Sequence, residues 1–200
     1  MTILDTINTK YSKIIFVEIE KYLKSPITNY CLPASDSEII QNTKGELRQL
    51  ERLTARLCLK KSVKNYQGVN YHENGRPYLI GEHQQLSISH SRDILCVLLS
   101  DSEFIGIDIQ FPSEKIRRVA HRVFNEGELN WANDDLKKLT QLWCVKEAVF
   151  KSCRIKGLDF RKEILVDTKT FIVSVQKGNY TQSFSVEVID FKGYCTAYIL

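Results

Sequence analysis

The sequence predicts an α+β fold with two similarly ordered halves. Its segments follow the order strand, long helix, strands, and then strand, helices, strands. The second order begins near residue 102, so we expect one α+β half over residues 1–102 and another over residues 103–200. The 200 residues, 43% of them hydrophobic, are enough for a real core in one domain or two small ones.

The composition narrows the class of protein. Lys and Arg number 28 against 24 Asp and Glu, and the formal charge of +4 suits an anionic ligand or an acidic protein partner. Nucleic acid is not expected, because no Lys/Arg-rich run is interleaved with aromatic residues. Six cysteines without a Cys-x-x-Cys pair argue against a zinc site or a disulfide framework. No apolar stretch approaches the ~20 residues of a membrane span, and no signal peptide is evident. We expect a cytoplasmic protein that does not bind a membrane.

The first half begins with a strand and a long helical region. Residues 13–19 are rich in β-branched side chains and predict the first strand. Ser35 with Glu38 three residues later predicts a capping box. The helical region runs from about residue 37 to 63, with Gly45 as a candidate interruption. Its apolar residues recur at helical spacing: Leu47, Leu50, Leu53, Leu57 and Val63.

Three arginines line another face of this helix. Arg48, Arg52 and Arg56 recur at four-residue intervals. Arginines in such a row can bind phosphate, but a solvated helix face explains the same spacing equally well. The spacing alone leaves both interpretations open.

A hairpin is predicted over residues 69–79, because Asn74-Gly75 is the strongest two-residue turn signal. Pro77 predicts that the second arm lies at a sheet edge. Two further strands are predicted over residues 85–91 and 94–99.

In the second half, the predicted strand over residues 104–110 carries a carboxylate in apolar surroundings. Ile105, Ile107 and Ile109 share one face, and Gly106, Asp108 and Gln110 share the other. Asp108 must therefore pair with a cation, accept backbone hydrogen bonds or bind a metal, and the sequence leaves these three alternatives open. Gly106 predicts close approach by a ligand or another backbone, or a bulge.

The rest of the second half reads as helices followed by strands. We expect a helix capped by Ser113, a short helix over residues 126–131, and a helix capped by Asn133 or Asp134 that runs to about Cys153. Strands are then predicted over residues 163–166, 170–176, 183–189 and 194–200.

The last of these helices places Glu147 and Lys151 one turn apart on one face, with Trp143 one turn before Glu147 as an apolar anchor. Alone, the pair is typical of a helix surface. Together with Asp108, however, Glu147 supplies a second hard oxygen ligand. Mg²⁺ commonly takes one or two protein carboxylates and completes its shell with water and substrate phosphate. Two carboxylates therefore point to a phosphate-bearing substrate.

His90 lies at a strand end between Ser89 and Ser91. It could be a core residue, a base or a phosphate donor, and a Ser-His pair lacks an identified acid to orient the imidazole. Donation to phosphate fits best. With Arg76, Lys146 and Lys151, the chain holds more cations than one phosphate needs, so a ligand with several phosphates is indicated.

Several of these stretches resemble the motifs of a known protein family. The sequence resembles the longer type of 4′-phosphopantetheinyl transferase, which activates peptide synthetases and carrier proteins. Four stretches carry the resemblance, in the family's order: Asn74-Gly75-Arg76-Pro77, Leu86-Ser87-Ile88-Ser89-His90-Ser91, Ile105-Gly106-Ile107-Asp108-Ile109, and residues 142–151, Leu-Trp-Cys-Val-Lys-Glu-Ala-Val-Phe-Lys. The Gly-Ile-Asp strand together with the Trp-x-x-Lys-Glu-Ala-x-x-Lys helix is fairly specific for this family, and the four stretches together are strong evidence for the resemblance.

The resemblance implies a fold and a reaction. Two α+β halves would pack as a pseudo-dimer within a monomer, with coenzyme A in the cleft between them and Mg²⁺ at its pyrophosphate. A serine of an apo acyl or peptidyl carrier protein would attack the β-phosphate, and 3′,5′-ADP would leave. The alternative is a non-catalytic module that binds coenzyme A or a carrier protein.

The resemblance also assigns residues. Asp108 and Glu147 would hold the metal, and together with Lys151, which would bind phosphate near the transferred arm, they are the expected catalytic residues. The expected ligands of the nucleotide-side phosphates are Arg48, Arg56, Arg76, Ser89 and His90, with Arg52 as an alternative on the same helix. Lys146 would point either into the site or to solvent.

Gln110 is a departure from the family. Many relatives have a second acid two residues after the strand aspartate, where this chain has Gln110. We expect Gln110 to offer the metal a neutral oxygen, so that the site has one fewer negative charge. Metal affinity is then in question. Glu128 is a candidate for a role behind the metal ligands, although a surface position is expected.

Overall fold

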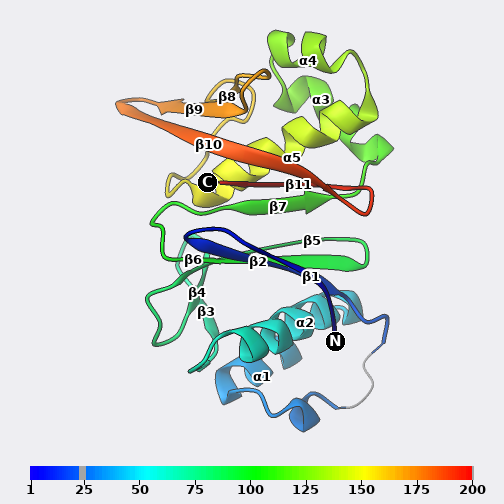
Figure 1. Ribbon diagram of the computed structural model, residues 1–200, viewed down its shortest axis with the longest axis vertical. Coiled ribbons are helices and arrows are strands. Elements are labelled where there is room, and N and C mark those ends of the chain that lie inside the picture. Colours follow the sequence, from blue (N-terminus) through cyan, green and yellow to red (C-terminus); the bar gives the residue numbers. More distant parts are fainter. Residues whose placement is uncertain (23–25, 200) are drawn as a thin grey trace. The chain divides into compact units, whose positions relative to one another are not determined.

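The computed structural model describes residues 1–22 and 26–199. The chain forms two compact units, Met1–Glu103 and Phe104–Leu200 (Figure 1). Each unit contains an antiparallel sheet and helices, which confirms the predicted α+β class. Among these residues, no helix is both long enough and apolar enough to cross a membrane. Leu200, the end of the last predicted strand, lies outside the described residues.

The first unit is built on a six-stranded sheet with the order β1-β2-β6-β5-β4-β3. The strands are β1 (Thr2–Asn8), β2 (Ser12–Glu18), β3 (Val69–Tyr71), β4 (Pro77–Leu79), β5 (Gln85–Ser91) and β6 (Ile94–Ser100). The apolar strands β2 and β6 pair with each other along their full length. Ile15, Val17 and Val97 on these strands are buried in the core of this unit.

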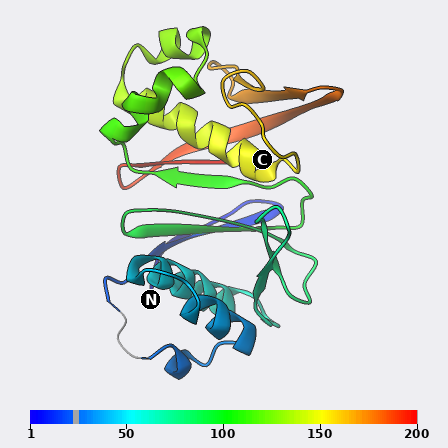
Figure 2. The same ribbon diagram turned by 180° about the vertical axis from the view of Figure 1, so that it is seen from behind.

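The helices of this unit are η1 (Ile27–Tyr30), α1 (Ala34–Gln41) and α2 (Glu46–Ser62). Gly45 directly precedes α2 with φ +89°, which confirms that the predicted helical region is interrupted there. Helix α2 packs against the sheet (Figures 1 and 2), and Leu50, Cys58 and Leu59 join the core. Of the apolar residues predicted at helical spacing, Leu50, Leu53 and Val63 are buried, whereas Leu57 is half-buried and Leu47 at the first turn is exposed.

Three predictions for this unit were wrong. Strand β1 precedes the strand predicted as the first, and its exposed edge position explains why it lacks an apolar run. The capping box is absent: α1 begins after Pro33, without a side-chain cap. The edge strand of the predicted hairpin is β3 and not β4, which contains Pro77 and lies between β3 and β5. Strand β4 tolerates the proline because it pairs with β5 at one position only, Tyr78 with Gln85.

The second unit is built on a five-stranded sheet with the order β7-β11-β10-β9-β8. Its strands are β7 (Ile107–Gln110), β8 (Ile164–Val166), β9 (Ile172–Lys177), β10 (Tyr180–Phe191) and β11 (Tyr194–Ile199). Its helices are α3 (Glu114–Val123), α4 (Glu126–Ala132) and α5 (Leu136–Ser152). Helix α5 lies across the sheet and contacts β7 and β11 (Figures 1 and 2).

Helix α5 is capped by Asp135, whose carboxylate accepts a hydrogen bond from the Lys138 amide at 2.9 Å. The predicted caps, Asn133 and Asp134, instead adopt left-handed backbone angles with φ of 47° and 56°. Two such residues end α4 and turn the chain, so the cap falls one residue later. Trp143 packs near Phe160 with 6.4 Å between the ring centroids, as expected of an apolar anchor.

Gly106 lets the chain entering β7 approach α5 very closely. A Cβ atom at this position would lie 1.8 Å from the carbonyl oxygen of Ala148 and 3.3 Å from the amide nitrogen of Ser152. Of the interpretations left open by the sequence, close approach of another backbone is therefore correct. The contact fixes the distance between β7 and α5, and so between Asp108 and the α5 side chains.

We predict that Gly106→Ala destabilises the protein by ~2 kcal/mol or more, because a backbone atom blocks the new methyl group and β7 or α5 must move. Urea unfolding measures the loss. Gly127→Ala is the matched control: it lies in α4, its Cβ would meet only the Asn125 side chain at 3.4 Å, and alanine favours a helix. Equal stabilities of wild type and Gly106→Ala would contradict the close-contact account.

Candidate active site

Strand β7 and helix α5 bring together the acid and the amine that the sequence singled out. The Nζ atom of Lys151 donates to Oδ1 of Asp108 at 2.7 Å and to the carbonyl oxygen of Ile107 at 2.9 Å. Asp108 is buried, whereas the Lys151 side chain remains 27% exposed. In the structure, the buried Asp108 carboxylate thus has a cation partner on α5.

Glu147 belongs to the same group of charges. Burial raises the pKa of Glu147 from its ordinary value of 4.5 to about 7; the negative charge of Asp108 adds to this effect, and Lys151 opposes it. A like charge and an opposite charge act in this way only at short range. Asp108, Glu147 and Lys151 therefore form one electrostatic cluster, which we call the acid–lysine cluster.

The cluster also has a neighbour that the sequence gave no reason to select. Cys144, one turn before Ala148 on α5, is fully buried. Burial raises the pKa of the Cys144 thiol, and contacts with Cys195 and Asp108 add to this effect. The Cys144 thiol donates to the carbonyl oxygen of Cys195 at 3.4 Å, as a small and weakly polar buried group can.

The donors of the acid–lysine cluster fit a hard divalent cation. Asp108 and Glu147 supply carboxylate oxygens, and Gln110 lies on the same face of β7 as Asp108. The Gln110 amide nitrogen donates to the carbonyl oxygen of Phe111 at 3.2 Å. Over the described residues, no group of three or more His, Cys, Asp or Glu side chains is placed to hold a metal. Mg²⁺ commonly takes only one or two protein carboxylates and completes its shell with other oxygen ligands, so Asp108 and Glu147 are sufficient in number for such a site.

Lys146 does not take the role predicted for it. Its side chain is fully buried, and its Nζ lies 2.7 Å from Oε2 of Glu128. The same ammonium donates to the carbonyl oxygens of Val123 at 3.1 Å and Phe160 at 2.6 Å. Three acceptors satisfy the three protons of the ammonium. Lys146 thus points neither to solvent nor to a ligand, and it joins α5 to the segments around it.

Glu128 was expected at the surface, and it is buried instead. Its Oε2 accepts the Asn125 amide at 2.9 Å in a capping box, and its Oε1 accepts the Val166 amide at 3.0 Å. The capping box was visible in the sequence as Asn125 followed by a glutamate three residues later. The Lys146–Glu128 pair is a structural element of the second unit.

In the first unit, several of the predicted phosphate ligands line one pocket of about 340 Å³. Arg48, Arg52 and Arg56 from α2 line it together with His90 from β5. Nδ1 of His90 lies 3.3 Å from Oε1 of Glu51, and the imidazole is 46% exposed. Glu51 also lines the pocket. Sequence reasoning missed it, because a single glutamate among helix arginines suggests only an ordinary surface pair.

Arg56 is held differently from the other two arginines. It is 1% exposed, its Nε lies 3.3 Å from Oδ1 of the buried Asp36, and its Nη2 donates to the Tyr71 hydroxyl at 3.0 Å. Asp36 also accepts from the Val69 amide at 3.1 Å. Arg56 therefore ties α1, α2 and β3 together. Arg48 and Arg52, which are more exposed, are the better candidates for a ligand.

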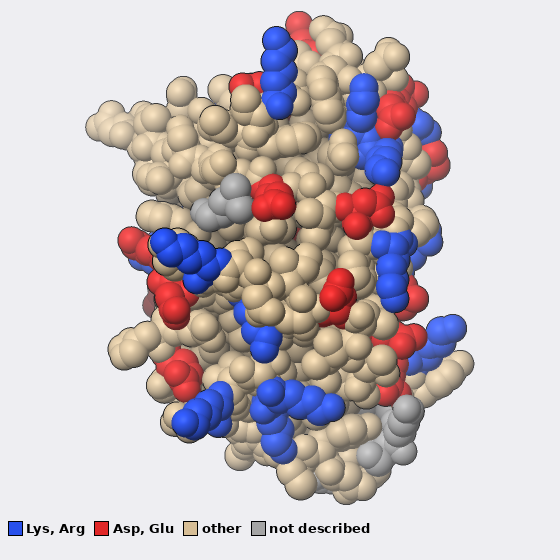
Figure 3. Space-filling model, in the orientation of Figure 1, with Lys and Arg blue, Asp and Glu red and all other residues tan. Residues whose placement is uncertain are grey.

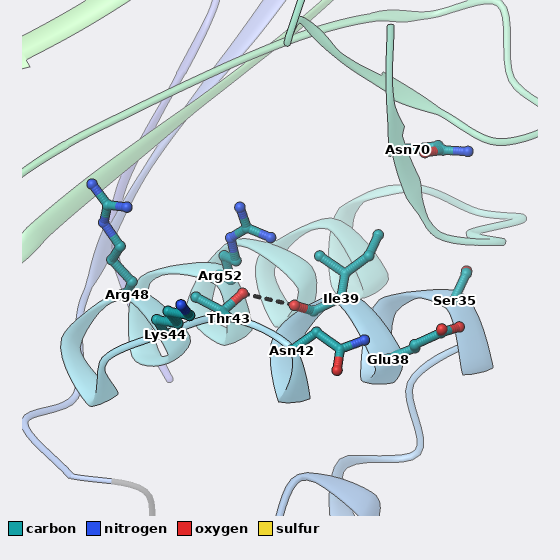
Figure 4. A pocket seen from close by; sticks show the side chains of 9 residues that line it. All are labelled: Ser35, Glu38, Ile39, Asn42, Thr43, Lys44, Arg48, Arg52 and Asn70. Carbon is teal, nitrogen blue, oxygen red and sulfur yellow. Dashed lines mark hydrogen bonds between the residues drawn. The ribbon is translucent and has the colours of Figure 1, made fainter. Parts of the chain in front are cut away.

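A second pocket of about 700 Å³ opens on the α1 side of the same arginines. Figure 4 shows Arg48 and Arg52 extending their guanidinium groups to the same side of α2, away from α1. Lys44 and Asn70 also line this pocket. Lys and Arg side chains gather over α1 and α2 on the face seen in Figure 3. This part of the first unit can attract a polyanion.

Arg76 and Ser89 lie outside both pockets. Nη2 of Arg76 donates to Oε1 of Gln85 at 3.2 Å. Ser89 is buried, and because neighbouring side chains alternate along a strand, it faces the side of β5 opposite to His90. The structure thus brings His90, Arg48 and Arg52 together, without the side chain of Ser89.

Comparison with known proteins identifies the second unit. A family model described as the 4′-phosphopantetheinyl transferase superfamily matches residues 104–199. This segment belongs to the 4′-phosphopantetheinyl transferase superfamily. It contains Asp108, Gln110 and Glu147 together with both lysines considered above, so the family resemblance inferred from the sequence is confirmed here.

Relatives in this superfamily match more of the chain. A Haemophilus influenzae protein, named as a proposed 4′-phosphopantetheinyl transferase, is 31% identical over 140 residues, which cover 64% of this chain and 58% of the relative. The 4′-phosphopantetheinyl transferase AcpT of Salmonella typhimurium is 30% identical over 124 residues, which cover 58% of this chain and 64% of the relative. The chain thus matches less than two thirds of the length of either relative.

We predict that Lys146→Met costs about 3–5 kcal/mol of unfolding free energy, because it leaves the Glu128 carboxylate buried without its cation. Glu128→Gln/Lys146→Met removes both charges and should lose less than the single variant. Urea unfolding of both proteins checks this. If the double variant is the less stable of the two, the pair is not the buried ion pair described here.

A second prediction concerns Glu147 in metal-free protein with EDTA. The folded state holds the proton of the Glu147 carboxyl group more tightly than the unfolded state does. Protonation of Glu147 therefore favours the folded state, and this contribution to stability is complete below about pH 4.5 and is lost as pH rises through about 7. Glu147→Gln cannot ionise. The free energy of unfolding of Glu147→Gln, relative to that of wild type, should therefore increase between pH 4.5 and 8, by as much as ~3 kcal/mol.

Thermal and urea unfolding at several pH values measure this difference, with the exposed Glu126→Gln as the control. A difference between Glu147→Gln and wild type that does not change with pH would show that the Glu147 carboxyl is not buried beside Asp108.

Proposed function

We propose that this protein is a Mg²⁺-dependent 4′-phosphopantetheinyl transferase. It moves the 4′-phosphopantetheine arm of coenzyme A to a serine of an apo acyl or peptidyl carrier protein and releases 3′,5′-ADP. The observation that carries the proposal is the acid–lysine cluster, which lies within the segment that matches the superfamily. The names of the relatives support the same reaction.

In the proposed reaction, the serine oxygen of the carrier forms a bond to the β-phosphorus of coenzyme A. The bond from this phosphorus to the oxygen that bridges to the α-phosphate breaks, and 3′,5′-ADP leaves with that oxygen. Glu147 accepts the serine proton, since a carboxylate placed beside the reacting hydroxyl can act as a general base. Lys151 binds a phosphate oxygen of the transferred group.

Phosphoryl-type transfer depends mainly on positioning and charge neutralisation. Asp108, Glu147 and Gln110 would hold Mg²⁺, which supplies positive charge to the diphosphate when it is bound. The protein's own contribution is the rigid placement of these side chains. Asp108 is fixed on β7 and Glu147 on α5, and the Gly106–Ala148 contact sets the spacing between the two elements.

For the nucleotide end of coenzyme A we propose Arg48, Arg52 and His90, with Arg76, whose sequence neighbours Gly75 and Pro77 line the same pocket, as a further ligand. The three pocket residues present two guanidinium groups and an imidazole to one cavity. Guanidinium groups bind phosphate through paired hydrogen bonds. We leave Arg56, Lys146 and the Ser89 side chain out of the ligand site, because each is buried in the protein.

We also propose that the protein works in the cytoplasm as a monomer. All six cysteines are thiols in the structure, which suits a reducing compartment. The proposed catalytic side chains all come from one unit of one chain.

The test is the intact mass of apo carrier proteins incubated with the protein, coenzyme A and Mg²⁺. We predict an added mass of one phosphopantetheine group on at least one carrier of a panel. Asp108→Ala and Glu147→Ala should reduce the initial rate by ~100-fold or more, because each removes a charge on which positioning depends. Asp101→Ala, an exposed acid of the first unit, is the control.

Near-normal rates in either variant would remove that residue from the catalytic group. Gln110→Glu should lower the Mg²⁺ concentration needed for half-maximal rate, since it restores a carboxylate on the Asp108 face. If no carrier in the panel gains mass although the protein binds coenzyme A, the result favours the alternative, a binding module without transferase activity.

A further inference from the structure

We propose that the Lys151 ammonium and a divalent cation compete for the Asp108 carboxylate. Lys151 would thereby set the metal affinity of the site, and metal and phosphate ligands would bind cooperatively. This inference rests on the proposed function for the identity of the ligands. Its own subject is the metal-binding property of the chain, which can be measured without any transfer reaction.

The contacts of Lys151 supply the first part of the argument. Its ammonium lies 2.7 Å from Oδ1 of Asp108. The other carboxylate oxygen, Oδ2, is buried in the protein, so Oδ1 is the oxygen left for a metal to bind. Its second partner is the Ile107 carbonyl oxygen at 2.9 Å, on the residue before Asp108. Lys151 thus contacts both the Asp108 side chain and the backbone of the residue before it.

The difference in mobility between the two partners supplies the second part. Asp108 sits on a paired strand, where it lies opposite Ala197 of β11, and its side chain is 8% exposed. The Lys151 side chain is 27% exposed, and it has four rotatable bonds. The ammonium can therefore swing away from Asp108, whereas the carboxylate stays in place.

Charge balance supplies the third part. Asp108 and Glu147 repel each other, and the Lys151 cation offsets this repulsion in the absence of metal. A divalent cation on the same carboxylates would supply the same compensation and would repel the ammonium at short range. Because Gln110 stands in place of a third acid, the site has too little negative charge to neutralise both the Lys151 ammonium and a divalent cation.

A phosphate group changes this balance. It offers the displaced ammonium a new anionic partner, so that Asp108 becomes available to the metal. Each ligand then helps the other to bind, and the coupling must be the same in both directions. In this account Lys151 exchanges one anion for another and is never left without a partner.

The test is calorimetric titration of metal-free protein with Mn²⁺, a spectroscopically and thermodynamically convenient probe of a magnesium-type site. Lys151→Met removes the competing charge and keeps the length of the side chain. We expect it to bind Mn²⁺ about five- to tenfold more tightly than wild type. This fold-change corresponds to the interaction energy of a strong ion pair that is partly exposed to solvent. Lys156→Met, an exposed lysine just beyond α5, is the matched control and should leave Mn²⁺ affinity unchanged.

A second arm repeats the titration in the presence of saturating 3′,5′-ADP or coenzyme A. Wild type should bind Mn²⁺ more tightly with coenzyme A than without it, and Lys151→Met should lose most of this gain. Unchanged or weaker Mn²⁺ binding by Lys151→Met would overturn the inference. Lys151→Gln is read in the same way if the methionine variant does not fold, as judged by circular dichroism.

The outcomes also separate this inference from the proposed function. Tighter Mn²⁺ binding by Lys151→Met in a protein that modifies no carrier would support the competition and count against the transferase. Carrier modification by wild type, without a change in Mn²⁺ affinity in the lysine variant, would support the transferase and overturn the competition.

Discussion

The close approach of Gly106 to the carbonyl of Ala148 is the constraint on which the candidate site depends. Every residue other than glycine would place a Cβ atom inside α5. The contact holds β7 against the helix, and two residues later along the strand Asp108 meets Lys151. On the helix, Glu147 and Lys151 flank Ala148, the residue that receives the strand. Packing and chemistry are therefore set by the same few residues.

Two kinds of buried charge in the second unit serve different ends. Glu128 and Lys146 satisfy each other and the surrounding backbone, and both are closed to solvent. In the acid–lysine cluster, the pKa of Glu147 is raised by burial and by Asp108. Lys151 offsets that repulsion while remaining partly exposed. The first pair stabilises structure, and the second group retains an imbalance of charge that a ligand can relieve.

The sequence predicted the α+β class and the break at Gly45, because apolar periodicity and turn residues report local geometry directly. Helical spacing also predicted that Glu147 and Lys151 share one face of a helix, whereas their association with Asp108 was inferred from ligand chemistry and from the family resemblance. The sequence could not predict β1, an edge strand that buries little. Nor could it separate Arg48 from Arg56, or Lys146 from Lys151. These residues have the same chemistry and nearly the same spacing, and only tertiary contacts with Asp36 and Glu128 decide which are buried. Their roles were predicted least well for this reason.

The central claim is that Asp108 and Glu147 together hold the cation on which transfer depends. The most direct measurement is an anomalous diffraction map from crystals grown with Mn²⁺ and coenzyme A. The account predicts a single strong peak in contact with carboxylate oxygens of both residues, with Lys151 moved from Asp108 to a phosphate. A peak bound by other residues, or Lys151 still on Asp108 beside a bound metal, would contradict it.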